Sequence, residues 1–140
     1  KNRDFKPAKK LLKFFMPIIV AGCIVVGIFA KPLCIFVFGS EYAGTANILR
    51  AFLPAIAAIL PSYIFGFPAM GALGISKYAN TSIFVGTAIH IAGLSILFIT
   101  GNFSAVTLAG MTSVSEVSIL AYRMFIVYKN RGLIKGDAAQ

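Results

Sequence analysis

Residues 51–76 read AFLPAIAAILPSYIFGFPAMGALGIS, a stretch without a single charged side chain. A helix needs about 20 mainly apolar residues to cross the hydrocarbon core of a bilayer. Because the chain holds three other runs of this kind, we expect an all-α, polytopic membrane protein, a bundle of four transmembrane helices. The predicted spans are about 14–38, 46–72, 78–100 and 105–127.

The overall composition excludes an ordinary soluble domain. Hydrophobic residues make up 59% of the 140 residues, charged residues only 12%, and the mean hydropathy is +0.88. Soluble domains carry about 25% charged residues. A small fold also leaves much of its surface in water, so a chain this apolar needs lipid as its solvent.

The positions of the basic residues explain the net charge of +9. They flank the apolar runs and are not interleaved with aromatic residues, so we expect no nucleic-acid partner. Eleven of the thirteen Lys and Arg residues fall on the side of the N-terminus, against Lys31 and Arg50 on the other. The positive-inside rule therefore places both termini in the cytoplasm. Residues 1–13 form a basic cytoplasmic lead-in and residues 128–140 a basic cytoplasmic tail.

The second span carries a proline every seven residues, at Pro54, Pro61 and Pro68. Seven residues nearly complete two helical turns, so the three rings lie roughly on one face. Each proline removes a backbone hydrogen bond and frees a carbonyl one turn earlier. Transporters use such broken helices as hinges and as binding walls. Two interpretations stay open, a hinge or a kinked helix packed against its neighbours.

Local signals predict where helices end and where they touch. Gly39 is expected to take a left-handed cap conformation, and Ser40 to accept hydrogen bonds from the first turn of the next helix. Small residues at helix-packing spacing predict close contacts between helices, namely Ala51 and Ala55, Ala88 and Ala92, and Ala105 and Ala109.

No enzyme signature is present, so we predict neither an enzyme nor a metal or cofactor site. The chain has one histidine and four carboxylates, and it lacks a phosphate-binding loop and a zinc-binding pair. Glu116 is the candidate with the clearest physical argument, because a charge near the middle of a span is costly. Thr112 and Ser113 share its helix face. The carboxylate is expected either to bind a proton or cation or to bond structurally to neighbouring helices.

Two further residues are candidates for transport or ion coupling. His90 lies near the middle of the third span, where it can serve in a proton relay or be hydrogen-bonded in the core. Arg50 lies near the outer end of the second span, where it can attract a phosphate, reach the lipid headgroups or pair with Glu41. Arg123 is expected to contact headgroups at the cytoplasmic edge.

The segment 38–50, FGSEYAGTANILR, resembles a stretch of polysaccharide flippases. Those proteins belong to the multidrug/oligosaccharidyl-lipid/polysaccharide exporter superfamily. The resemblance extends to the basic lead-in KKLLK at residues 9–13, to the turn at residues 71–77 and to the pair Ser115–Glu116 in the last span.

This resemblance implies that the chain is the C-terminal part of a larger two-lobed transporter, an expectation that agrees with a first residue other than Met. The implied function is flipping of a lipid-linked oligosaccharide or polysaccharide repeat unit, such as an O-antigen unit of lipopolysaccharide, by alternating access. The implied partners are the lipid-linked oligosaccharide, membrane lipids, Na+ or H+ as coupling ion, and the remaining helices of the same transporter. The implied location is the bacterial cytoplasmic (inner) membrane.

Two alternatives remain. One is a multidrug or peptidoglycan-precursor exporter of the same superfamily. The other is a small membrane protein that oligomerises as an assembly subunit.

Overall fold

The computed structural model describes residues 6–130, and within them the side chains of residues 10–130. This part of the chain is helical and contains no strand. The elements are α1 (Lys6–Phe38), the short 3-10 helix η1 (Ser40–Gly44), α2 (Thr45–Phe65), α3 (Phe67–Ala72), α4 (Lys77–Ile99) and α5 (Ala105–Lys129). Four helical segments are long and apolar enough to cross a membrane, with α2 and α3 together making one of them. The predicted all-α, polytopic membrane fold is confirmed.

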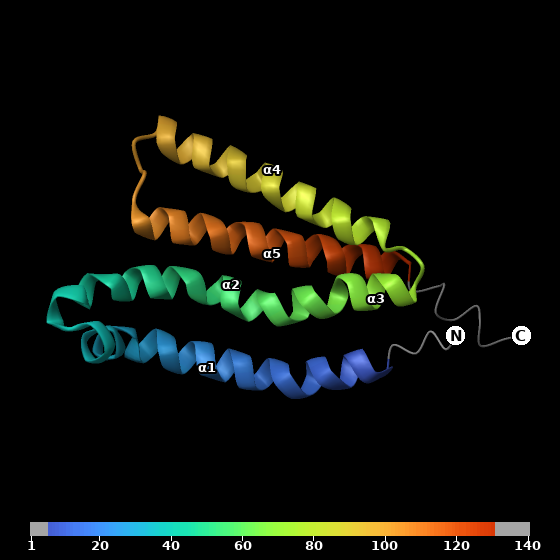
Figure 1. Ribbon diagram of the computed structural model, residues 1–140, viewed down its shortest axis with the longest axis horizontal. Helices are drawn as coiled ribbons and strands as arrows, with labels where there is room; N and C mark the ends of the chain where they lie inside the picture. Colours follow the sequence, from blue (N-terminus) through green and yellow to red (C-terminus); the bar gives the residue numbers. More distant parts are fainter. Residues whose placement is uncertain (1–5, 131–140) are drawn as a thin grey trace, which may run out of the picture.

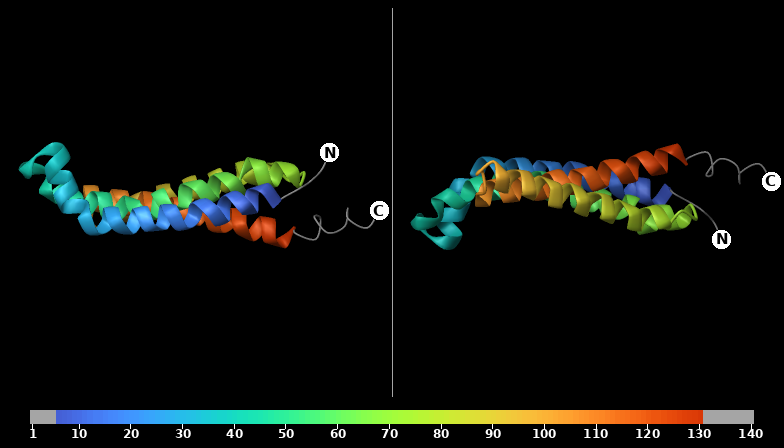
Figure 2. Two further views of the ribbon diagram at one scale, coloured as in Figure 1. Left: turned by 90° about the horizontal axis from the view of Figure 1, so that it is seen from below. Right: turned by 90° about the horizontal axis from the view of Figure 1, so that it is seen from above.

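The four spans lie side by side in one thin layer (Figures 1 and 2). Their order across the layer is α1, α2, α5, α4, and each helix packs mainly against its immediate neighbours in that row. The last helix in sequence therefore lies between α2 and α4. The start of α1 and the end of α5 lie at the same end of the layer (Figure 1). The predicted basic lead-in becomes helical at Lys6, and most of the predicted tail lies outside the described residues.

The break after α1 uses a glycine, as expected, but the next helix starts differently. Gly39 has a φ of 99°, and its amide donates to the carbonyl of Ile35 at 2.9 Å. Within the described residues the side chain of Ser40 caps neither η1 nor α2, so that prediction was wrong. Instead, the amide of Tyr42 donates to the carbonyl of Gly39 at 3.1 Å, and the chain forms one tight 3-10 segment before α2. Backbone bonds thus take the place of the side-chain cap.

The second span is broken at Gly66, which lies between Pro61 and Pro68. α2 continues through Pro54 and Pro61 and ends at Phe65. The backbone then changes direction at Gly66, with φ −73° and ψ −126°, before α3 begins. Pro68 lies in the first turn of α3, where a missing N–H costs little because the first amides of a helix have no intrahelical partner. The bend at Gly66 therefore lies five residues, or about one and a half helical turns, beyond Pro61.

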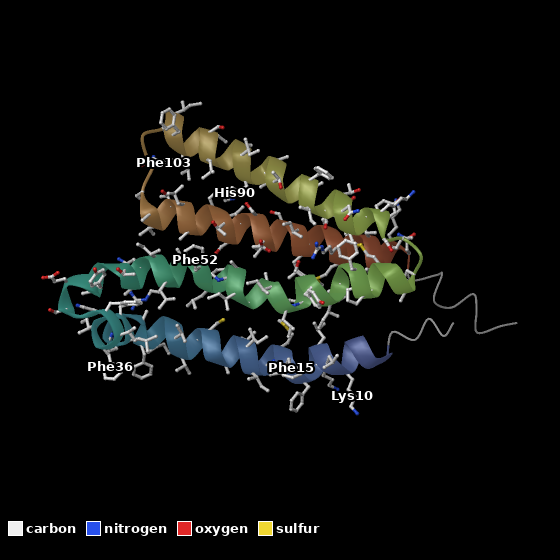
Figure 3. All side chains as sticks on the ribbon, in the orientation of Figure 1. Lys10, Phe15, Phe36, Phe52, His90 and Phe103 are labelled. Atoms are coloured by element: carbon white, nitrogen blue, oxygen red, sulfur yellow. The ribbon has the colours of Figure 1, made fainter. Side chains whose placement is uncertain are left out.

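Few side chains of the spans are buried within the described part of the protein. One small core joins α3, α4 and α5 around Met70, which is fully buried. In α1, by contrast, only 11% of the most apolar stretch is buried. Phe15 and Phe36 point away from the other helices (Figure 3), and Phe36 is 89% exposed. Such a surface is suited to lipid or to further helices rather than to water.

Close packing of α4 on α5 depends on two glycines. A Cβ added at Gly86 would lie 2.3 Å from Cγ1 of Ile119, and one added at Gly93 would lie 2.2 Å from Sδ of Met111. Gly86 and Gly93 are seven residues apart and share the face toward α5. The predicted packing pair, Ala88 and Ala92, is exposed instead. The expectation of small residues at the contact is right for α4, but in the middle of the helix the residues are the glycines, because they and not Ala88 and Ala92 lie on the facing side.

We expect Gly86→Ala to lower the free energy of unfolding in detergent by about 1–3 kcal/mol relative to Gly22→Ala, because Ile119 is β-branched and stiff. Gly93→Ala should cost less, since the thioether of Met111 can move aside. Gly22 is the matched control, with nothing within 4 Å of an added Cβ. Equal stabilities of the Gly86 and Gly22 variants would contradict the close α4–α5 contact.

Candidate functional site: a polar seam along α5

The central helix α5 is the least apolar of the four spans. Four of its polar side chains, Ser113, Ser115, Glu116 and Arg123, are here called the polar seam. Ser113 contacts α2, Ser115 contacts α4 and Arg123 contacts both. In hydrocarbon a polar group without a partner is costly, so such side chains are expected to turn toward protein. Three of the four are hydrogen-bonded across helix boundaries.

Ser113 joins α5 to α2. Its hydroxyl donates to the carbonyl of Ala51, and it accepts from the amide of Ala55 at 3.3 Å. In a regular α-helix the amide of Ala55 would donate to the carbonyl of Ala51, four residues earlier. The hydroxyl of Ser113, only 5% exposed, therefore lies against a backbone turn of α2 and bonds to both of its polar ends. Pro54 lies within the same turn and contributes no N–H to it.

His90 joins α4 to α5. It points from α4 toward α5 (Figure 3), and its Nδ1 lies 2.9 Å from Oγ of Ser115. The hydroxyl of Ser115 also donates to the carbonyl of Met111 at 2.9 Å. A serine hydroxyl has one hydrogen. Because the hydroxyl hydrogen of Ser115 is donated to the carbonyl of Met111, Nδ1 of His90 must be the donor to Oγ of Ser115. In a neutral ring Nε2 then carries no hydrogen and is an acceptor.

Arg123 connects three helices at once. Its Nε donates to Oγ of Ser82 in α4 at 2.8 Å. Its Nη1 donates to the carbonyl and the hydroxyl of Ser62 in α2, at 2.7 and 3.0 Å. The guanidinium packs against the bend of the second span, because a Cβ at Gly66 would lie 3.0 Å from Nη1. Arg123 thus turns inward, and the expected contact with lipid headgroups is replaced by these buried serines.

Glu116 is the member of the seam without a hydrogen bond among the described residues. It is half-buried near the middle of α5. Its charge attracts the guanidinium of Arg123, which lies seven residues further along the helix. That separation is about two helical turns, or roughly 10 Å, so the attraction acts through space without direct contact. The carboxylate oxygens remain available to a cation, a proton, water or a substrate hydroxyl.

Arg50 lies on the α1 side of α2, away from the seam. Its Nε donates to the carbonyl of Gly27 at 3.0 Å, and its Nη1 donates to Oδ1 of Asn47 at 3.2 Å. No ion pair with Glu41 forms within residues 6–130. The structure therefore brings His90 and Glu116 to the same pair of helices and keeps Arg50 apart from them. The structure adds Ser62 and Ser82, which the sequence analysis did not name, and it shows that Ser115 of the flippase-like pair contacts His90.

Within the described part of the chain, no group of three His, Cys, Asp or Glu residues could hold a metal ion. Comparison of the chain with protein-family models, with curated proteins and with solved structures gave no match. The function is therefore argued from the seam and from the layer of helices that carries it.

Proposed function

We propose that this chain is the C-terminal four-span part of a transporter that flips a lipid-linked oligosaccharide across the bacterial cytoplasmic membrane. The observation that carries the proposal is Glu116, a half-buried carboxylate in mid-span without a hydrogen bond among the described residues. An ionisable group at this depth is costly and marks a pathway for ions or polar substrates. The flippase-like segment 38–50 supports the choice of substrate class.

The single layer of helices supports a role as one part of a larger transporter. A row of four spans buries little of its own apolar surface and leaves both faces uncovered. In a two-lobed transporter, further helices of the same polypeptide would cover one face and enclose a cavity beside the seam. Glu116 would then face water or sugar in that cavity.

The hydrogen bonds between α5 and its two neighbours suggest how the layer would move. Ser113 and Arg123 attach α5 to α2, while Arg123 and His90 attach it to α4. These three spans would rotate as one unit in alternating access. Binding of Na+ or H+ at Glu116 would remove its negative charge and favour the state in which the carboxylate is closed off from water.

Replacing Glu116 by Gln in the full-length transporter should lower translocation by about tenfold or more, because the amide keeps the shape but loses the charge. The measurement is the amount of surface polysaccharide made by cells that carry only the variant, at expression matched by immunoblot. Glu41→Gln is the control, since Glu41 is an exposed carboxylate in η1. Full activity of the Glu116 variant would rule out a role in transport.

One alternative also accounts for the uncovered faces, namely a small membrane subunit that packs against copies of itself. The size of the native polypeptide distinguishes the two. A product with several additional apolar spans supports the transporter, whereas one ending near 140 residues supports the oligomer.

The proposed orientation has both termini in the cytoplasm. A cysteine introduced at Asn102, in the turn between α4 and α5, should react with a membrane-impermeant maleimide added to intact cells. One at Asn130, after α5, should react only after the membrane is opened. The native Cys23 and Cys34 would first be replaced by Ser to remove background. The reverse pattern of labelling would invert the assignment.

A further inference from the structure

A groove of about 440 Å³ runs between α1 and α2, on the side of α2 opposite to the polar seam. Its walls are almost entirely apolar, with Ile24 on one side and Leu53 and Pro54 on the other. Two small residues line the groove, Gly27 in α1 and Ala57 in α2, and Cδ1 of Leu53 packs close to Gly27. Its volume falls in the range of about 300–1,000 Å³ typical of small-molecule sites.

Arg50 is the charged residue among those that line this groove. Its hydrogen bonds to Gly27 and Asn47 hold the guanidinium in place against α1. Arginine has five N–H donors, so several of them remain without a partner among the described residues. Because Pro54 lacks an N–H, the backbone carbonyl of Arg50 also loses its helical donor. Unused donors and an unused acceptor therefore lie together at one end of the groove.

The occupant that fits this arrangement is an amphiphile with an anionic head. A guanidinium without a carboxylate partner is suited to a phosphate, which accepts two of its N–H groups. Arg50 and Ala57 are seven residues apart, so the apolar floor extends about 10 Å from the charge. Soluble phosphate would leave this floor empty, whereas one acyl chain would cover it.

We propose that the groove binds an anionic phospholipid of the bilayer, with its phosphate on Arg50 and one acyl chain between α1 and α2. A hydroxyl of a glycerol headgroup can donate to the carbonyl of Arg50. The lipid would complete the interface of α1, which packs mainly against α2 and η1. This site is separate from the proposed transport pathway and does not depend on it.

Native mass spectrometry of the purified full-length protein tests the site, with phosphatidylglycerol and phosphatidylcholine supplied at equal concentrations. The wild-type protein should retain phosphatidylglycerol preferentially. Arg50→Gln should weaken that binding by about tenfold. This change in affinity corresponds to the free energy of about one charge-assisted hydrogen bond. Ala57→Phe, which fills the groove and keeps the charge, should weaken binding of the same lipid. Glycerol phosphate without acyl chains should not displace it.

Lys77→Gln is the matched control, because it removes an equal charge from an exposed residue far from the groove. Arg50→Lys, which keeps the charge, gives a second measure if Arg50→Gln fails to fold, and should bind at an intermediate level. Equal loss of lipid in the Lys77 variant would overturn the proposal, because it would show general attraction to basic residues. Unchanged binding in Ala57→Phe, or displacement by glycerol phosphate, would also overturn it.

Discussion

Hydrocarbon offers no water to a polar group, and this constraint shapes the packing of the layer. Apolar side chains gain little by leaving lipid for protein, so they do not by themselves hold one span against another. Polar side chains gain more, because their alternative is an unsatisfied group in the membrane. In this protein they gather on α5. Ser113 bonds to the backbone of α2, Ser115 to His90 of α4, and Arg123 to serines of both. The last span in sequence is thereby fixed inside the row, between α2 and α4.

The same constraint distinguishes polar side chains that hold the structure together from those that are free to take part in transport. Arg123 makes its hydrogen bonds to Ser62 and Ser82 within the described part of the protein, and the glycine at the bend of the second span leaves room for its guanidinium. Its charge is therefore solvated by protein. Among residues 6–130 Glu116 makes no such bonds and keeps only a long-range attraction to Arg123. This difference explains why Glu116, and not the more extensively bonded Arg123, is the residue proposed to take part in transport.

The spans could be predicted from the sequence because their length and apolarity are local properties that the bilayer dictates. The hydrogen-bond partners between helices could not be predicted, because they depend on the order of the four spans in the layer. Arg123 looks like a charge at the membrane edge, and only the placement of α5 between α2 and α4 turns it toward two serines. In α4 the spacing rule selected Ala88 and Ala92, while the facing side carries Gly86 and Gly93. Glu116 and His90 could be named as candidates because ionisable groups in a span are rare enough to stand out.

A double-mutant cycle between Arg123 and Ser82 tests the central claim most directly, namely that the polar seam holds neighbouring spans together. The free energy of unfolding would be measured in detergent for Arg123→Gln, Ser82→Ala, the double variant and the wild-type protein. The account predicts a coupling energy of about 1 kcal/mol or more, as for a hydrogen bond with a charged donor. A coupling below about 0.3 kcal/mol would show that the two residues act independently. The bond would then be incidental to the packing of α4 on α5.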